Sequence, residues 1–186
     1  MNIAVFGGSF DPPHTGHKKI VDEALKNLDI DRLILIPTYI NPFKSKFFAP
    51  ADLRKKWLKK LFGNRTKIYI SDYETEKKRA VSTYESIEYI KKTYNPRKIY
   101  LIIGSDNFEK LHLWKNYDKL IKDVELVIAQ RDEIKVNKNL KKLNINVNIS
   151  STKLRENLDL DFIPKIIQKE VKEFYEKQNS QDSFTT

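Results

Sequence analysis

IAVF at residues 3–6 and GGSFDPPHTGH at residues 7–17 form the most informative segment of the sequence. The four apolar residues predict a buried strand. A helix after the loop is predicted by apolar side chains at helical spacing, namely Ile20, Val21, Ala24, Leu25 and Leu28. The two adjacent glycines permit close approach of the backbone to a ligand, and a helix N-terminus favours a phosphate. The segment therefore predicts a phosphate site between the first strand and the first helix.

The rest of the chain alternates apolar runs of strand length with segments of helical periodicity. Further strands are predicted at residues 33–36, 67–70, 99–103 and 124–129, with a short sixth strand at 147–149. Continuous apolar runs are typical of parallel strands buried on both faces. Alternation with helices predicts an α/β fold, a doubly wound, Rossmann-like parallel sheet in the order 3-2-1-4-5, with helices at the C-terminus.

Length and composition narrow the class of protein. The 186 residues suit one domain, which we expect at residues 1–177, with 178–186 as a flexible tail and 131–144 as an exposed excursion. The chain has no cysteine, which excludes a disulfide scaffold and a thiolate metal site. It has neither the pattern of a signal peptide nor an apolar run of the roughly 18 residues that a membrane span needs. We therefore expect a cytoplasmic enzyme without a membrane partner.

The net charge of +10 comes from 35 Lys and Arg against 25 Asp and Glu. Such an excess attracts polyanions, and a nucleic-acid-binding protein is one alternative that it raises. However, the lysines are spread along the whole chain, which is typical of a solvated surface. We therefore expect no nucleic-acid partner. The sequence leaves the oligomeric state open, with a homo-oligomer among the alternatives.

Two of the three histidines, His14 and His17, lie in the segment at residues 7–17, which we call the opening loop. Each ring can donate a hydrogen bond to a phosphoryl oxygen. A zinc site with Asp11 as third ligand is an alternative, as is a turn with incidental histidines. A Walker loop is excluded because no Gly-Lys-Ser/Thr follows. Far along the chain, ISSTKLR at residues 149–155 places hydroxyls at an expected helix start, with Arg155 one turn on. An ordinary Ser/Thr helix cap is the alternative there.

HTGH at residues 14–17 resembles the HxGH signature of the nucleotidyltransferase superfamily, and residues 7–17 closely resemble the bacterial nicotinate mononucleotide adenylyltransferases. ISSTKLR resembles the second superfamily signature, ISSTxxR, and the resemblance spans residues 3–175. It implies adenylyl transfer from ATP to nicotinate mononucleotide, which gives deamido-NAD and pyrophosphate in NAD biosynthesis. It also implies Mg2+ held by the phosphates, with no metal ligand from the protein. Nicotinamide mononucleotide or phosphopantetheine is the alternative acceptor for the same chemistry.

The resemblance assigns roles to individual residues. The catalytic residues that it implies are His14, His17, Lys44 and Arg155. Besides both histidines and Arg155, it implies ATP contacts from Gly7, Gly8, Ser9, Phe10, Gly104, Asp106, Arg131, Ser150, Ser151 and Thr152. It implies acceptor contacts from Lys44, Thr83 and Trp114, whose indole ring matches a platform for the pyridine ring. Glu74 matches an acidic position of the family to which we assign no role.

Topology gives an independent check on these positions. In a sheet ordered 3-2-1-4-5, the first and fourth strands flank the point where the winding reverses, and ligands bind beyond the carboxyl ends of the strands there. The loop at residues 7–17 follows the first strand, and GSDNF at residues 104–108 follows the fourth. Both loops are therefore expected to border one crevice.

Overall fold

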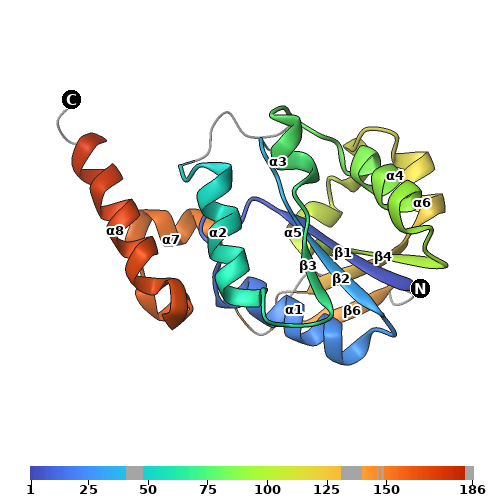
Figure 1. Ribbon diagram of the computed structural model, residues 1–186, viewed down its shortest axis with the longest axis horizontal. Coiled ribbons are helices and arrows are strands. Elements are labelled where there is room, and N and C mark those ends of the chain that lie inside the picture. Colours follow the sequence, from blue (N-terminus) through green and yellow to red (C-terminus); the bar gives the residue numbers. More distant parts are fainter. Residues whose placement is uncertain (41–47, 131–139, 146, 148, 183–186) are drawn as a thin grey trace.

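The computed structural model describes residues 1–40, 48–130, 140–145, 147 and 149–182 of the chain. They form one six-stranded sheet in the order β3-β2-β1-β4-β5-β6, in which every neighbouring pair is parallel (Figure 1). The strands are β1 (Asn2–Gly8), β2 (Arg32–Pro37), β3 (Ile68–Ile70), β4 (Lys98–Gly104), β5 (Glu125–Gln130) and β6 (Lys141–Asn144). The doubly wound parallel sheet and its predicted strand order are confirmed.

The predicted position of the sixth strand is wrong. The strand β6 lies at Lys141–Asn144, within the predicted excursion 131–144, whereas residues 147 and 149 lie outside any strand. Leu143 and Ile145 are each 1% exposed and alternate with exposed residues, which is the pattern of an edge strand. Exposed lysines are common on such edges because they discourage pairing with another chain. A search for continuous apolar runs passes over this alternating pattern.

The helices cover both faces of the sheet. They are α1 (Thr15–Asn27), α2 (Ala51–Phe62), α3 (Tyr73–Lys77), α4 (Thr83–Tyr94), α5 (Ser105–Phe108), α6 (Tyr117–Asp123), α7 (Ser151–Asn157) and α8 (Lys165–Asp182), with 3-10 turns η1 (Leu111–Leu113) and η2 (Leu160–Phe162). One core cluster packs α1 and α2 against one face of the sheet, where Ala4 and Phe6 point. A second cluster packs α4 and α6 against the other face, where Ile3 and Val5 point.

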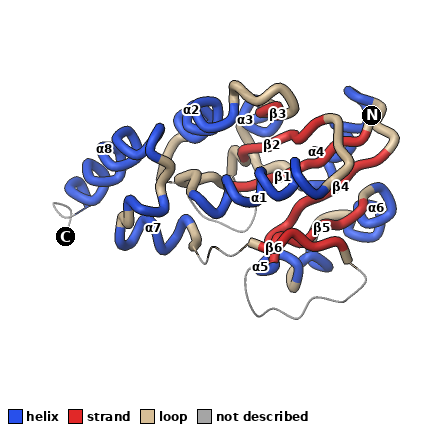
Figure 2. Tube along the Cα trace, turned by 90° about the horizontal axis from the view of Figure 1, so that it is seen from below, coloured by secondary structure: helices blue, strands red, loops and turns tan. Residues whose placement is uncertain are grey.

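A third apolar cluster holds the C-terminal helices. Trp57 of α2 is fully buried among residues of α7 and α8, including Leu154, Ile167 and Val171. Figures 1 and 2 show α7 and α8 to one side of the sheet, away from the start of β1. The helix α8 continues to Asp182, so the tail expected from residue 178 begins inside a helix.

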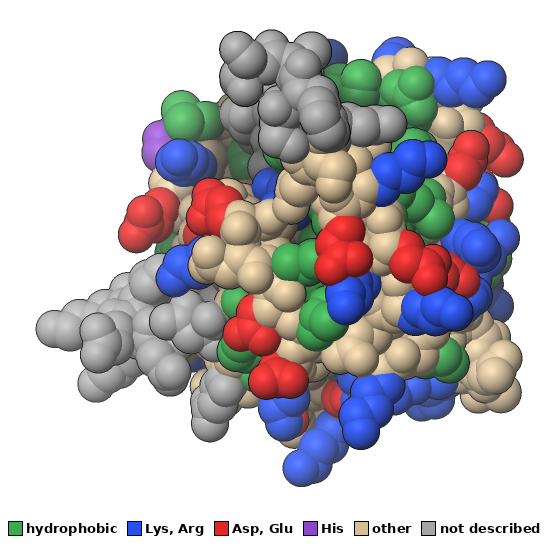
Figure 3. Space-filling model, turned by 90° about the vertical axis from the view of Figure 1, so that its left-hand side faces the viewer, with side chains coloured by type: hydrophobic (Ala, Val, Ile, Leu, Met, Phe, Trp, Pro, Cys, Tyr) green, Lys and Arg blue, Asp and Glu red, His purple; other side chains and the backbone are tan. Residues whose placement is uncertain are grey.

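Charged side chains of both signs are mixed on the face of the molecule shown in Figure 3. This arrangement fits the prediction that the lysines form a solvated surface. None of the helices in the described ranges is both long and apolar enough to cross a membrane.

Two adjacent isoleucines of α8 test whether the third cluster anchors this helix. Ile167 is fully buried, whereas Ile166 is 64% exposed. We expect Ile167→Ala to lower the free energy of unfolding by about 2–5 kcal/mol, because it leaves a cavity. Ile166→Ala should change it by less than about 0.5 kcal/mol. Urea unfolding measures both values, and equal effects of the two substitutions would contradict the packing of α8.

Candidate active site

A cavity of about 630 Å³ opens beside the ends of β1 and β4, at the reversal of the winding. Its lining includes thirteen residues that the sequence proposes as ligand contacts: Gly7, Gly8, Ser9, Phe10, His14, His17, Thr83, Gly104, Asp106, Trp114, Ser150, Ser151 and Thr152. The structure thus brings the opening loop, the junction of β4 and α5, and the start of α7 to one place. Lys44 and Arg131 lie outside the described residues.

The two histidines of the opening loop form a compact unit at the start of α1. Their rings stack with centroids 3.7 Å apart, and the backbone N–H of His14 donates to Nδ1 of His17 over 3.2 Å. Because Nδ1 accepts this bond, a neutral His17 carries its proton on Nε2. A Cβ atom on Gly16 would lie 2.9 Å from Nδ1 of His14, so only glycine fits between the two histidines.

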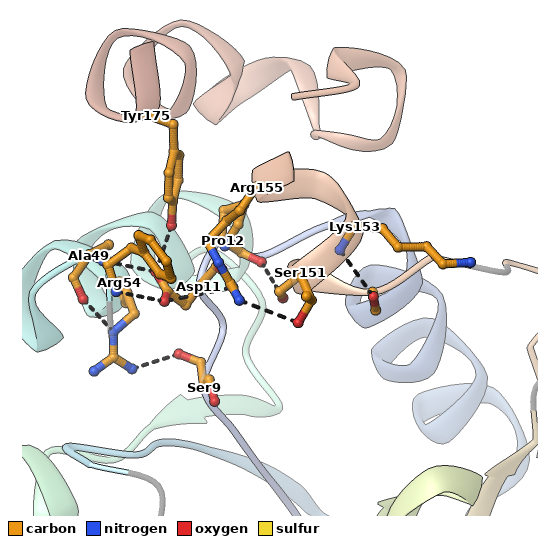
Figure 4. Close-up of polar contacts among 12 residues, drawn as sticks. Ser9, Asp11, Pro12, Ala49, Arg54, Ser151, Lys153, Arg155 and Tyr175 are labelled. Carbon is orange, nitrogen blue, oxygen red and sulfur yellow. Dashed lines mark hydrogen bonds and ion pairs between the residues drawn. The ribbon is translucent and has the colours of Figure 1, made fainter. Parts of the chain in front are cut away.

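Hydrogen bonds of the Asp11 carboxylate connect the opening loop to two other segments (Figure 4). Its Oδ1 accepts from the N–H of Ala49 over 2.9 Å and from the hydroxyl of Tyr175 over 2.6 Å, and its Oδ2 accepts from the N–H of Phe48 over 3.1 Å. Asp11 is 1% exposed. Burial and the nearby carboxylate of Asp11 raise the pKa of Tyr175, which keeps its hydroxyl a donor. These contacts hold the loop against α8 and the segment before α2.

Arg155 contacts Asp11 and is not among the residues that line the cavity. Its Nη1 donates to the carbonyl oxygen of Asp11 over 2.5 Å and lies 3.8 Å from Oδ2, while Nη2 donates to Oγ1 of Thr152 over 3.3 Å. The guanidinium also lies 4.7 Å from the ring centroid of Phe48. In this conformation Arg155 therefore stabilises the opening loop and Thr152 instead of pointing into the cavity.

Arg54 is a buried arginine that no motif of the sequence indicates as a site residue. It is fully buried on α2 and donates to three backbone carbonyls, those of Ala49 (2.9 Å), Ser9 (2.6 Å) and Tyr39 (3.2 Å). Burial lowers its pKa, and the charge of Asp11 opposes that shift. The available signal is its position three residues before Trp57, on the apolar face of the helix, where a charged side chain must find buried partners.

The three hydroxyl residues of ISSTKLR line the cavity, and one of them also caps α7. The Oγ atom of Ser150 accepts from the N–H of Lys153 over 3.3 Å, and the hydroxyl of Ser151 donates to the carbonyl oxygen of Pro12 over 3.1 Å. The alternative of an ordinary helix cap is thus correct for Ser150, but this does not remove it from the cavity wall. The bond from Ser151 joins residues 139 positions apart and ties the two phosphate motifs together.

The start of α4 and the turn after η1 form another part of the wall. The hydroxyl of Ser82 caps α4 by accepting from the N–H of Glu85 over 3.3 Å. Trp114 is half-buried, packed in the second core cluster and also in contact with the cavity. Asp106 is exposed in the lining after β4. This part of the wall therefore offers a helix N-terminus, an aromatic ring and a carboxylate.

Glu74 of α3 also lines the cavity, although it is only 5% exposed. Its Oε1 accepts from the hydroxyl of Ser86 over 2.7 Å. Burial raises the pKa of Glu74 to about 7; the hydrogen bond from Ser86 opposes this shift, and the charge of Glu85 adds to it. Within the part of the chain that the structure describes, no group of three or more His, Cys, Asp or Glu residues could hold a metal ion.

The buried contacts of Asp11 predict a large effect on stability. Asp11→Asn removes the charge beside Arg155 and turns an amide donor toward groups that themselves donate. We expect it to lower the free energy of unfolding by about 3–5 kcal/mol. Asp52→Asn is the matched control, because the side chain of Asp52 is 92% exposed, and it should cost less than about 0.5 kcal/mol. Urea unfolding separates these outcomes, and a small effect at Asp11 would show that its contacts are not needed.

Comparisons with known proteins identify the family of the chain. Residues 5–157 match the family described as cytidylyltransferase-like. A probable nicotinate-nucleotide adenylyltransferase of Campylobacter jejuni is 51% identical over 177 residues, which are 95% of this chain and 98% of the relative. One from Sulfurimonas denitrificans is 45% identical over 177 residues, or 95% and 96% of the two chains.

Solved structures of similar proteins share the fold over nearly the whole chain. The nicotinic acid mononucleotide adenylyltransferase of Plasmodium falciparum, complexed with NaAD, has a TM-score of 0.76 at 22% identity and covers 97% of both chains. A putative nicotinate-nucleotide adenylyltransferase of Vibrio parahaemolyticus has a TM-score of 0.71 at 21% identity, over 91% of this chain and 97% of its own. The sequence match over most of the chain and the near-complete coverage of its relatives show that this chain belongs to the cytidylyltransferase-like proteins, in the family of nicotinate-nucleotide adenylyltransferases.

Proposed function

We propose that the protein transfers the adenylyl group of ATP to nicotinate mononucleotide and releases deamido-NAD and pyrophosphate, as a step of NAD biosynthesis. One observation carries the proposal: a single cavity is lined by both phosphate motifs and by Trp114 with the start of α4. ATP and its acceptor can therefore meet in one space. The names of the relatives support the choice of acceptor.

The reaction needs no nucleophile from the protein. An oxygen of the acceptor phosphate attacks the α-phosphorus of ATP in line, a new P–O bond forms, and the bond to the β-phosphate breaks with release of pyrophosphate. The acceptor phosphate is already ionised near neutral pH, so catalysis depends on positioning and on stabilising charge. ATP enters with Mg2+, which keeps several waters and binds mainly phosphate oxygens.

The opening loop and ISSTKLR supply donors for the triphosphate. We assign hydrogen bonds to phosphoryl oxygens to His14 and to Nε2 of His17, with the backbone from Gly7 to Phe10 close to the nucleotide. The hydroxyls at residues 150–152 and the side chain of Asp106 complete the nucleotide contacts. In the conformation described above, Arg155 positions Thr152 and the opening loop, and it reaches a phosphate only by turning away from Asp11. Lys44 and Arg131 keep the roles that the family resemblance implies.

The acceptor ring fits the wall formed by Trp114 and α4. The indole of Trp114 offers a flat platform for a pyridine ring. The N–H groups of Thr83 and Tyr84 lie in the first turn of α4, where the helix dipole favours an anion such as the ring carboxylate. An uncharged amide gains less from this environment. We further propose that the protein acts in the cytoplasm as one domain that includes α8, with neither a nucleic-acid nor a membrane partner.

The acceptor is tested by pyrophosphate release from ATP and Mg2+, with nicotinate mononucleotide and nicotinamide mononucleotide offered separately. We expect a higher kcat/KM for the acid, because its carboxylate meets the start of α4. Equal use of both would contradict the assignment of the acceptor and leave adenylyl transfer standing. Release with phosphopantetheine alone would identify the alternative acceptor.

The role of His17 is tested by comparison with the third histidine of the chain. His17→Ala removes a donor to the triphosphate and should lower kcat by about 10²–10³-fold. His112 is exposed on η1 and is not among the residues that line the cavity, so His112→Ala should leave kcat nearly unchanged. Near-normal turnover of a folded His17→Ala enzyme would rule out the role assigned to His17.

A further inference from the structure

Glu74 is a buried carboxyl group in the cavity wall that the proposed chemistry does not use. Its Oε1 is bound by Ser86, while its Oε2 is buried and has no hydrogen-bond partner among the described residues. A buried carboxylate is costly when its oxygens are not satisfied, whereas the neutral acid requires less solvation. The surroundings of Glu74 therefore favour its protonated form.

The charged groups around Glu74 do not stabilise a negative charge on its carboxyl group. Glu85 of α4 repels it, and the nearby cation Arg79 is engaged by Glu85 through contacts of 2.5 and 3.1 Å. The hydroxyl of Tyr73 donates to Glu85 over 3.3 Å, so it too is directed away from Glu74. No ion pair of Glu74 occurs in the described ranges. His14, His17, Asp106 and Lys115 are the other titratable residues that line the cavity. With its pKa raised to about 7, Glu74 changes charge near neutral pH.

Glu74 is hydrogen-bonded to the first turns of α4, where the proposed function places the ring carboxylate of the acceptor. Ser86 is the fourth residue of α4, and it lines the cavity together with Ser82 and Thr83. The start of this helix attracts an anion through its dipole and its N–H groups. A negative charge on Glu74 would oppose that attraction, and a neutral Glu74 would leave it intact.

We propose that Glu74 is a specificity-determining residue whose neutral form admits the ring carboxylate of the acceptor and whose anionic form disfavours it, so that the preference for acid over amide depends on pH. This inference rests on the proposed acceptor and on its orientation toward α4. It assigns Glu74 no contact with the reacting atoms. Its effect is therefore expected in KM for the acid, with kcat little changed.

The sign of the effect follows from the direction of the pKa shift. Below about pH 7 Glu74 is neutral and the acid binds well; above it Glu74 is ionised and the acid binds more weakly. We expect KM for nicotinate mononucleotide to rise about three- to tenfold across this range, as for one charge near a helix terminus. The phosphate group is common to the two acceptors, so its titration affects both alike. The ratio of kcat/KM for acid over amide therefore isolates Glu74.

The experiment measures that ratio between about pH 6 and pH 9 for the wild-type enzyme, Glu74→Gln and Glu76→Gln. Glutamine keeps the size of Glu74 and an acceptor for Ser86 but cannot ionise. The ratio should fall with pH in the wild type and stay flat in Glu74→Gln. Glu76 is exposed on the same short helix, so Glu76→Gln should follow the wild type. A falling ratio in Glu74→Gln, or a flat one in the wild type, would overturn the proposal.

A second measurement separates Glu74 from the choice of acceptor. Since the folded pKa of about 7 exceeds the ordinary value of 4.5, stability from the neutral acid is present at low pH and lost as pH rises through this interval. We expect the wild type to lose stability relative to Glu74→Gln between these two pH values in urea unfolding. A constant difference would overturn the proposal even if neither acceptor were used. If the wild type loses stability relative to Glu74→Gln as expected but does not prefer the acid at any pH, the assignment of the acceptor is contradicted instead.

Discussion

The buried carboxylate of Asp11 is the contact on which the arrangement of the site depends. It lies in the opening loop, between the two glycines that end β1 and the two histidines. It binds groups from the segment before α2 and from α8. Arg155 approaches the same residue from α7. A buried carboxylate is stable only where such donors surround it. The same contacts that solvate Asp11 therefore fix the opening loop relative to ISSTKLR, so the nucleotide site and the C-terminal helices form one structural unit.

The sequence predicts those parts of the fold that depend on local patterns of apolar and polar residues. Continuous apolar runs identify β1, β2, β4 and β5, because a strand buried on both faces has no polar alternation, and the predicted parallel order follows from the intervening helices. The strand β6 is misplaced because it is an edge strand, in which exposed lysines interrupt the apolar pattern. Its position depends on pairing with β5, which is a contact between distant segments that local periodicity does not contain.

The same distinction applies to the site. Residues within the two phosphate motifs are predicted because each motif is contiguous, and the structure brings them to one cavity. The role of Arg54 is not predicted from the sequence, because its partners come from three separate segments, at Ser9, Tyr39 and Ala49. Arg155 is identified as a site residue, but its direction toward Asp11 follows from a contact across 144 positions. Glu74 is visible as an acid, yet its raised pKa arises from burial that only the folded chain creates.

The proposed reaction is direct adenylyl transfer within one cavity, without a covalent intermediate on the protein. The stereochemistry at the α-phosphorus tests it most directly. ATP that carries a sulfur atom of defined configuration on the α-phosphorus would be reacted with nicotinate mononucleotide, and the configuration of the resulting dinucleotide would be determined. A single in-line attack predicts inversion. Retention would indicate two successive displacements through an adenylylated protein group, which would contradict the account of His14 and His17 as donors to the triphosphate.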